Sequence, residues 1–252
     1  MTIDDIVASP CSLPGAGAEE VLRVYRDLGY RYFEVFTSWA ASAFDYQRDP
    51  GYYRALGERY RIAFHSFHLP PVSDDIEASL AGALKAARFA KAIGVSIVLF
   101  KATTRANYIR AAKPFLDGVE GLGLTPVVQN HRGTAVSTLE DFREVLDGIA
   151  DVRMKALLEA GHFHSVGVHW KKGLELLGDR IALVHVKDQI GAQSVPFGDG
   201  EIDLPGLFES LAAAGYRGKY VVEMEVADKE NTIRYLADAL TYLRRVARGA
   251  PQ

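Results

Sequence analysis

The chain has 252 residues, of which 48% are hydrophobic and 24% charged, and its formal net charge is −3. This is the balance of an ordinary globular protein, and it provides neither a basic surface for nucleic acid nor a polybasic patch for a membrane. No apolar stretch approaches the length of a membrane span, and the N-terminus shows no secretory signal. The single cysteine, Cys11, cannot form an internal disulfide, so we expect a cytoplasmic protein.

Apolar runs of strand length alternate with helical patterns along the whole chain. Strands are expected at 5–8, 31–36, 61–65, 95–101, 125–130, 154–159, 181–187 and 219–225. Apolar residues recur at helical spacing in 19–29, 73–94, 137–149 and 228–248. Strands that alternate with helices indicate a parallel sheet, and at this length a single (β/α)8 TIM barrel over residues 1–252 is more economical than an open sheet with a second domain.

Local signals refine this assignment. The second helix is expected to start in the Ser-Asp-Asp segment 73–75, and the third to have a capping box of Ser137 with Glu140. The aromatic-rich region 40–60 is less regular, and we interpret it as a lid, a short helix or a dimer contact. No strand is followed by the glycine-rich fingerprint of dinucleotide-binding folds, which argues against a doubly wound open sheet.

Four consecutive strands in the second half of the chain end in a polar side chain that can bind a divalent metal. These side chains are Gln129, Glu159, His185 and Glu223. Active sites of parallel α/β folds lie at the carboxyl ends of the strands, so the four are expected to converge on one point. Two carboxylates, an imidazole and an amide oxygen suit Mn, Mg, Co or Zn.

More polar residues are expected around this point. The following are predicted to contact a substrate: Glu34, His65, His68, Lys101, His131 and Trp39. His162 and Lys187 follow two of the metal ligands closely, and both are expected to touch a substrate bound to the metal. A protonated lysine there would stabilise an oxyanion. Phe67 and Phe197 are expected either to form an apolar wall for a sugar together with Trp39 or to belong to the core.

Each of these residues, taken singly, is more often a cap, a hydrogen-bonded core residue or a solvated charge than a catalytic group. Polar ends on most of the predicted strands are harder to attribute to chance. Glu225 is expected to have no role because Glu223 already fills it, and His164 and His169 are expected to lie in the next loop or helix without chemistry. Cys11 is interpreted as a plain loop residue.

Short motifs in residues 154–226 occur in a characteristic order: EAGH, HVKD, GDGEID, GYRG and VVE. In this order and at this spacing they resemble the xylose isomerase-like TIM barrel superfamily, in particular its sugar isomerase/epimerase branch, and the resemblance covers nearly the whole chain. It implies that the catalytic metal is bound by the four strand-end residues given above. It also implies that His162 contacts the substrate and that Glu34 corresponds to an acid often found after the second strand.

Two positions depart from the family pattern. The fifth-strand ligand is usually Glu and is Gln129 here, and the sixth-strand ligand is usually Asp and is Glu159 here. Because an amide cannot act as a base, the two-base scheme of the ketose 3-epimerases fails on one side. The stretch NHRGT (130–134) resembles the His-x-Gly-Thr stretch of inosose dehydratases, which makes dehydration of a keto-polyol an alternative.

The resemblance therefore implies a divalent-metal-dependent sugar or polyol isomerase or epimerase that acts through α-proton abstraction and an enediolate. Glu223 is expected to be the base and Glu159 the second carboxylate of the catalytic group, with His162 and Lys187 stabilising the enediolate oxygen. The alternatives are an inosose-type dehydratase and a catalytically decayed sugar-binding barrel.

Phosphodiester hydrolysis, the activity of endonuclease IV in the same superfamily, is disfavoured by the negative charge and by Lys101 at a place where a further His ligand would be useful. A sugar or polyol is the expected partner. No nucleic acid and no membrane are expected, and a homodimer stays open.

Overall fold

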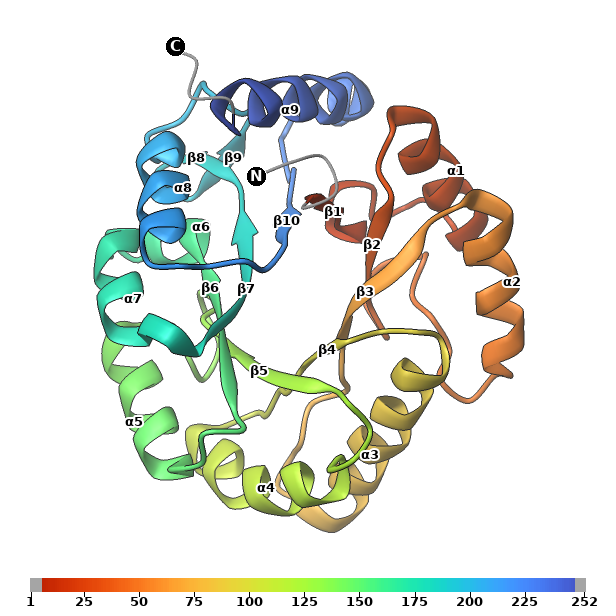
Figure 1. Ribbon diagram of the computed structural model, residues 1–252, viewed down its shortest axis with the longest axis vertical. Coiled ribbons are helices and arrows are strands. Elements are labelled where there is room, and N and C mark those ends of the chain that lie inside the picture. Colours follow the sequence, from red (N-terminus) through yellow and green to blue (C-terminus); the bar gives the residue numbers. More distant parts are fainter. Residues whose placement is uncertain (1–5, 248–252) are drawn as a thin grey trace.

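The computed structural model describes residues 6–247, and within this range eight parallel strands close into a barrel (Figure 1). Around the barrel the strands follow in the order β1, β10, β7, β6, β5, β4, β3 and β2. Their bounds are β1 (Ile6–Ala8), β2 (Tyr32–Val35), β3 (Ala63–His68), β4 (Ile97–Leu99), β5 (Thr125–Gln129), β6 (Lys155–Glu159), β7 (Ile181–Val186) and β10 (Tyr220–Val222). The prediction of a single (β/α)8 barrel is confirmed. Position 5 of the first expected strand and position 248 of the last expected helix lie outside the described residues.

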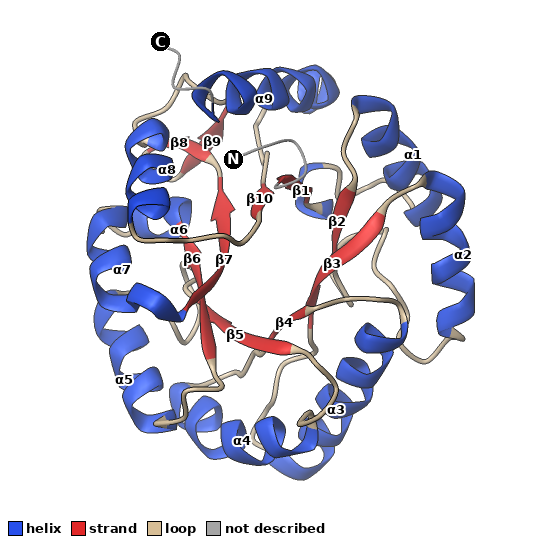
Figure 2. Ribbon diagram, in the orientation of Figure 1, coloured by secondary structure: helices blue, strands red, loops and turns tan. Residues whose placement is uncertain are grey.

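Helices surround the barrel and cover its outer face (Figure 2). Their bounds are α1 (Ala18–Leu28), α2 (Pro50–Tyr60), α3 (Ile76–Ala92), α4 (Arg105–Gly118), α5 (Leu139–Ile149), α6 (Ala160–His164), α7 (Trp170–Leu177), α8 (Leu204–Ala213) and α9 (Thr232–Ala247). The four predicted helices correspond to α1, α3, α5 and α9, and α3 follows the N-cap Asp75 inside the predicted segment. Region 40–60 contains the whole of α2. Among the described residues, no helix combines the length and apolarity needed to cross a membrane.

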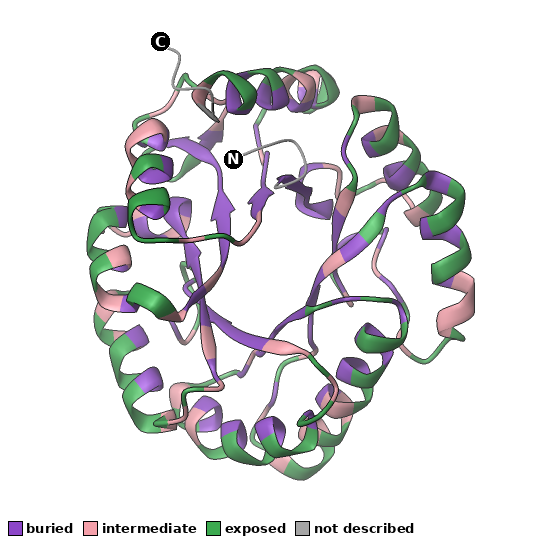
Figure 3. Cartoon of the chain, in the orientation of Figure 1, coloured by how far each residue is buried: buried purple, intermediate pink, exposed green. Residues whose placement is uncertain are grey.

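Apolar side chains occupy the barrel interior below the polar strand ends. They form a cluster of their own: Val7, Ile97, Leu99, Val127, Leu157, Leu183 and Val221. Outward-facing strand residues pack against the inner faces of the helices, so that the strands are buried and the outer helix faces exposed (Figure 3). Alternate residues of a strand share a face, so His185 points inward like Leu183, and Glu223 points inward like Val221. Both polar side chains lie above the apolar layer.

The N-terminus of α5 differs from the sequence prediction by one residue. Thr138 is the N-cap, its hydroxyl accepts from the backbone N–H of Asp141, and the Asp141 carboxylate accepts from the backbone N–H of Thr138. The predicted capping box of Ser137 with Glu140 was therefore wrong. The two pairs have the same spacing, and the hydroxyl of Ser137 is engaged elsewhere because it donates to the carbonyl oxygen of His131.

A short antiparallel hairpin, which the sequence did not predict, follows β7. It consists of β8 (Asp188–Ile190) and β9 (Gln193–Val195). Because β8 starts just beyond the end of β7, the hairpin lies at the carboxyl end of the barrel.

The carboxylate of Asp188 organises the chain after this hairpin. Its Oδ2 accepts the backbone N–H groups of Gly198 at 2.9 Å and Gly200 at 3.0 Å. Its Oδ1 accepts from Gln189 at 3.0 Å and from Ile202 at 3.4 Å. A Cβ atom on Gly200 would lie 2.0 Å from Oδ1 of Asp188, so the loop can close around the carboxylate only with glycine at this position.

Candidate metal centre and active site

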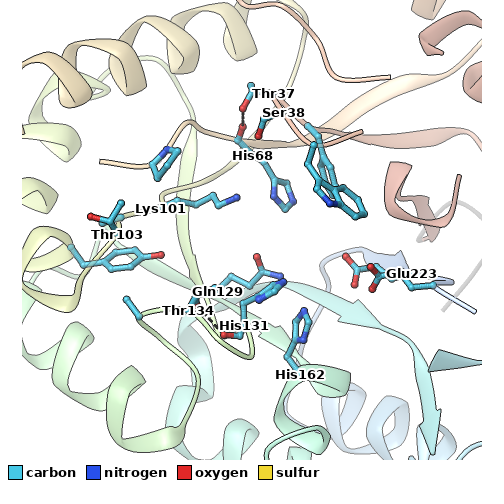
Figure 4. A pocket seen from close by; sticks show the side chains of 17 residues that line it. Thr37, Ser38, His68, Lys101, Thr103, Gln129, His131, Thr134, His162 and Glu223 are labelled. Atoms are coloured by element: carbon cyan, nitrogen blue, oxygen red, sulfur yellow. Dashed lines mark hydrogen bonds between the residues drawn. The ribbon is translucent and has the colours of Figure 1, made fainter. Parts of the chain in front are cut away.

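A cavity of about 540 Å³ opens at the carboxyl ends of the strands (Figure 4). Its size is typical of a small-molecule site. The predicted site residues that line it are Trp39, His68, Lys101, Gln129, His131, His162 and Glu223. Figure 4 shows Lys101 and Glu223 on opposite sides of the cavity, with Gln129 and the two histidines His131 and His162 between them.

Three of the four predicted metal ligands bring their donor atoms together. Glu159, His185 and Glu223 each offer one ligand atom, and these atoms lie within 4.8 Å of one another. Nδ1 of His185 is 3.2 Å from Oε2 of Glu159 and 3.1 Å from Oε1 of Glu223. The strand register explains this convergence, since Glu159 of β6 pairs directly with His185 of β7, and Val221 of β10 pairs with His185 from the other side.

The donor atoms at this point lack ordinary hydrogen bonds. Among the described residues, Oε2 of Glu159 and Nδ1 of His185 are buried and have no partner with hydrogen-bond geometry. Buried polar atoms without such partners are costly unless something else satisfies them. Two carboxylate oxygens and an imidazole nitrogen aimed at one point form a donor set that fits a divalent cation.

Gln129 ends β5, next to β6, and its side chain points into the cavity (Figure 4). It is 8% exposed, and no hydrogen bond joins its amide to another described side chain. Its carbonyl oxygen is therefore free to act as a neutral fourth ligand.

Glu34 does not line the cavity but lies behind His185. Its Oε1 is 3.1 Å from Nε2 of His185 and accepts a 2.8 Å bond from the hydroxyl of Ser66. Its Oε2 is 3.2 Å from Nε2 of His68. A carboxylate on one imidazole nitrogen fixes the ring orientation and directs the other nitrogen to a metal. The expected substrate contact of Glu34 is thus replaced by a role in positioning His185.

The charges in this network favour the ionised forms. Burial alone would lower the pKa of His185, but the carboxylates of Glu34, Glu223 and Glu159 outweigh it and raise that pKa well above its ordinary value. Burial would likewise raise the pKa of Glu34, but His185 and His68 lower it below the ordinary range. A cation at Nδ1 of His185 would therefore displace a proton, which makes metal binding stronger as pH rises.

Glu159 is held by a residue that the sequence analysis did not single out. The side-chain amide of Asn130 donates to the carbonyl oxygen of Glu159 and accepts from its backbone N–H, both at 2.9 Å. Oε1 of Glu159 accepts from the backbone N–H of Gly161 at 3.0 Å. With the backbone and one oxygen fixed, only Oε2 of Glu159 faces His185. Asn130 could have been found as part of the NHRGT stretch, but its role requires the neighbouring strand.

Lys187 is buried and does not line the cavity. Its ammonium lies 2.5 Å from Oε2 of Glu223 and 3.1 Å from Oε2 of Glu225. The expected contact of Lys187 with an enediolate oxygen is not supported by this geometry. Glu225, for which no role was expected, lines the cavity and shares the ammonium with Glu223.

His131 and His162 pack against each other with ring centroids 3.8 Å apart and ring planes tilted by 45°. Nδ1 of His131 is 2.9 Å from the carbonyl oxygen of Arg132. A carbonyl only accepts, so the proton of neutral His131 is assigned to Nδ1 and its Nε2 is left as the free ring nitrogen. Burial lowers the pKa of His162 to about 3, against the opposing effect of Glu159, and Lys187 adds to the lowering. His162 is therefore neutral at neutral pH.

Trp39 and Lys101 border the same cavity. Trp39 is 65% exposed, and its backbone adopts the left-handed conformation with φ 75°, which is uncommon for a bulky residue and marks functional segments more often than ordinary loops. Lys101 makes no side-chain hydrogen bond or ion pair with any described residue. Phe67 packs between barrel and helices against Phe89, and Phe197 packs against Tyr242. Neither lines the cavity, so only Trp39 of the predicted apolar wall is available to a sugar.

His65 lies at the opposite end of the barrel. Its ring contacts Tyr32, the first residue of β2, and the charge of Lys219, which precedes β10, acts on it. The predicted contact of His65 with a substrate is not supported by this position. Burial, followed by the charge of Lys219, lowers the pKa of His65 to about 4.

This depressed pKa predicts an acid-sensitive stability. Between pH of about 6.5, where a histidine ordinarily titrates, and about 4, the unfolded chain binds a proton that folded His65 does not, so stability falls as pH falls. The melting temperature of His65→Gln should therefore fall less across this window than that of the wild type. Some pH dependence should persist in the variant, because the pKa of His162 is lowered as well. Thermal melts followed by circular dichroism measure this. His169→Asn, which replaces an exposed cap of α7, is the control. An unchanged pH dependence in His65→Gln would contradict the assignment.

The half-buried His164 and the exposed His169 both have structural partners. Nε2 of His164 is 3.0 Å from Oε2 of Glu201, and Nδ1 of His169 accepts from the backbone N–H of Lys171. Cys11, interpreted as a plain loop residue, is instead buried beside Glu223 and Glu225. No sequence signal links it to β10.

Residues 22–246 match the family model of xylose isomerase-like TIM barrels. The chain belongs to the xylose isomerase-like TIM barrel family. Inosose dehydratase of Geobacillus thermodenitrificans (strain NG80-2) is 30% identical over 143 residues, which are 48% of each chain. The putative L-ribulose-5-phosphate 3-epimerase SgbU of Escherichia coli (strain K12) is 36% identical over 74 residues, 26% of each chain. The matches thus span about half the length of these curated relatives, or less.

Solved structures share the fold of this xylose isomerase-like barrel over nearly its whole length. The IOLI protein with a bound zinc atom superposes with a TM-score of 0.77 at 17% identity, and the match covers 96% of this chain and 98% of that chain. This likeness concerns the fold alone.

The structure gives physical reasons for the family motifs of this xylose isomerase-like barrel. In EAGH, a Cβ atom on Gly161 would lie 2.3 Å from Cγ of Lys187, so glycine makes room for the lysine of HVKD. The aspartate of HVKD, Asp188, binds the backbone of both glycines in GDG. The motifs are therefore spaced as they are because they contact one another around the centre.

Proposed function

We propose that this xylose isomerase-like barrel is a divalent-metal-dependent enzyme that removes the α-proton of a keto sugar or keto polyol to form an enediolate. The observation that carries the proposal is the convergence of Glu159, His185 and Glu223 within 4.8 Å beside an open cavity. The names of the relatives, an inosose dehydratase and a 3-epimerase of L-ribulose 5-phosphate, agree with such chemistry.

Glu159, His185 and Glu223, with the amide oxygen of Gln129, would hold the cation. Mn, Mg, Co and Zn all suit these ligands. A divalent ion at this point supplies Lewis-acid polarisation of a carbonyl, which lowers the barrier to removal of the neighbouring proton. Glu34 contributes by keeping Nε2 of His185 occupied, so that Nδ1 faces the ion.

The residues of this chain then move the proton. Burial opposes ionisation of Glu223, but Lys187 and His185 lower its pKa well below the ordinary value, so this cavity-lining carboxylate is ionised and can accept the α-proton. His162 is neutral and can donate an N–H to the oxygen on which charge develops, as neutral imidazoles do in other enolisation sites. Glu159 balances the charge of the cation.

The distribution of charge around the cavity favours isomerisation or dehydration over two-base epimerisation. Both carboxylates that line the cavity, Glu223 and Glu225, follow β10. The other walls carry Gln129, His131 and Lys101, none of which is an anionic base. A base on one side and proton donors on the other suit abstraction of an α-proton with protonation of a departing β-hydroxyl. Dehydration is therefore the second candidate, favoured over 3-epimerisation.

Substrate contacts come from the remaining cavity residues. The exposed ring of Trp39 offers a face on which the apolar side of a sugar or cyclic polyol stacks. Lys101, whose ammonium has no hydrogen-bond or ion-pair partner within residues 6–247, is available to bind a hydroxyl or carbonyl oxygen at the side remote from Glu223. His68 and His131 complete the polar lining.

A panel assay tests the proposal. The protein is stripped with a chelator, reloaded with Mn²⁺, Mg²⁺, Co²⁺ or Zn²⁺, and assayed on ketoses and inososes, with products identified by NMR. We expect turnover that is lost on chelation and restored by metal, with an isomerised or dehydrated product. Sugar binding without turnover under all metals would identify a binding barrel, and an epimer as the main product would contradict the one-base scheme.

A further inference from the structure

Lys187 occupies an unusual place for a lysine in a metal-binding barrel. Its side chain is 1% exposed, and its ammonium lies between two carboxylates, 2.5 Å from Glu223 and 3.1 Å from Glu225. One of these carboxylates is also a proposed metal ligand. The ammonium therefore lies on the far side of Glu223 from His185, which contacts the other oxygen, Oε1.

The groups around the ammonium have the composition of a second cation site. Donor atoms of Cys11, Glu223 and Glu225 lie within 4.8 Å of one another, just as those of Glu159, His185 and Glu223 do. The two groups share Glu223. Two adjacent donor groups bridged by one carboxylate are the arrangement of a two-metal centre. Here, however, a side chain of the protein supplies the positive charge to the second group.

We infer that Lys187 is the fixed second cation of this centre: it takes the place of a second metal ion and keeps the site mononuclear. The inference rests on the proposed metal site. A bound second ion would leave at low metal concentration, whereas a lysine is present under all conditions. Lys187 also contacts Oε2 of Glu223, so that Oε1 is the oxygen that faces the metal and Oε2 is the one that would accept the α-proton.

The surrounding chain is built to hold the lysine in this position. Gly161 leaves the space through which its stem passes, since a Cβ atom there would lie 2.3 Å from Cγ and 2.6 Å from Cδ of Lys187. Two carboxylates within 3.1 Å of the ammonium, those of Glu223 and Glu225, compensate for the burial of its charge. Since Lys187 does not line the cavity, a direct role on substrate does not explain its burial between carboxylates.

The test counts metal ions in the folded protein. With Co²⁺ or Zn²⁺, we expect about one ion per chain in the wild type and about two in Lys187→Met, because removal of the ammonium frees Cys11, Glu223 and Glu225 for a second ion. In the Co²⁺ form of the variant, thiolate ligation by Cys11 adds an intense near-ultraviolet charge-transfer absorption that the wild type lacks. The double variant Lys187→Met with Cys11→Ser should lose this absorption. Lys187→Arg should restore a single ion.

Matched variants separate this inference from the proposed function. Lys101→Met, at the other lysine near the cavity, should keep about one ion without the thiolate absorption. A folded Lys187→Met that binds one ion and shows no thiolate absorption would overturn the inference and leave the metal site intact. Thiolate absorption in the wild type would also overturn the inference. A wild type that binds no divalent ion would overturn the metal site itself. Lys187→Gln, closer in polarity, repeats the count if the Met variant does not fold.

Discussion

Glu223→Gln should slow exchange of the substrate's α-proton with solvent by about 10²–10⁴-fold, the usual contribution of a general base. Glutamine keeps an amide oxygen for the metal but cannot accept the proton. The two cations Lys187 and His185 outweigh the effect of burial and leave Glu223 ionised in the wild type, so the substitution removes a charged base and not a neutral group. Incorporation of deuterium from D₂O, followed by NMR under single-turnover and steady-state conditions, measures the effect apart from product formation.

Glu225→Gln is the matched control, because Glu225 lies two residues further along, lines the same cavity and pairs with the same lysine. We expect a much smaller loss of exchange for this variant. Metal content is measured for both, so that loss of the ion is not mistaken for loss of the base. If Glu225→Gln abolished exchange while Glu223→Gln retained it with metal bound, the base would be Glu225.

Asp188→Asn should destabilise the protein by about 3–5 kcal/mol, because a buried carboxylate with charge-assisted hydrogen bonds is lost. The side-chain NH₂ of asparagine would face backbone N–H groups, which are donors as well. Four backbone N–H groups, from residues 189, 198, 200 and 202, converge on this carboxylate. The amide of asparagine can accept only through one oxygen. Urea unfolding measures the loss, and the segment 196–202 should also become more accessible to proteases.

Asp199→Asn provides the control in the same loop. Asp199 is exposed, so its replacement should change the free energy of unfolding by less than about 0.5 kcal/mol. Equal stabilities of Asp188→Asn and Asp199→Asn would show that the hydrogen bonds of Asp188 do not hold the loop. A loss of stability without increased proteolysis of the loop would show that its effect lies elsewhere.

The fold and the convergence of Glu159, His185 and Glu223 were readable from the sequence for one physical reason. Buried parallel strands are short apolar runs, and a polar residue that ends such a run, as Glu159 or His185 does, has to point to the same end of the barrel as its neighbours. Parity within the strand then decides which residues point inward, and Leu183 with His185 confirms it. These rules act locally, so the residues of one strand suffice to apply them.

The functions of other polar residues depended on contacts between distant segments. Glu34 at the end of β2 was predicted at the substrate but is bonded to His185, 151 positions later, and Lys187 is tied to β10 instead of the cavity. His65 was assigned to the wrong end of the barrel because the third strand was expected to end at residue 65, whereas β3 continues to His68. The role of Asp188 in organising the loop was not predicted, because its four partners are backbone groups, which carry no sequence signal.

A crystal structure of the Mn²⁺-loaded protein with anomalous data will show whether Glu159, His185 and Glu223 share one cation. We expect a single anomalous peak about 2.0–2.3 Å from Nδ1 of His185 and from one oxygen of each carboxylate, with Nε2 still bonded to Glu34. Crystals grown at saturating Mn²⁺ with no peak at this point, or with the ion bound elsewhere in the cavity, would contradict it.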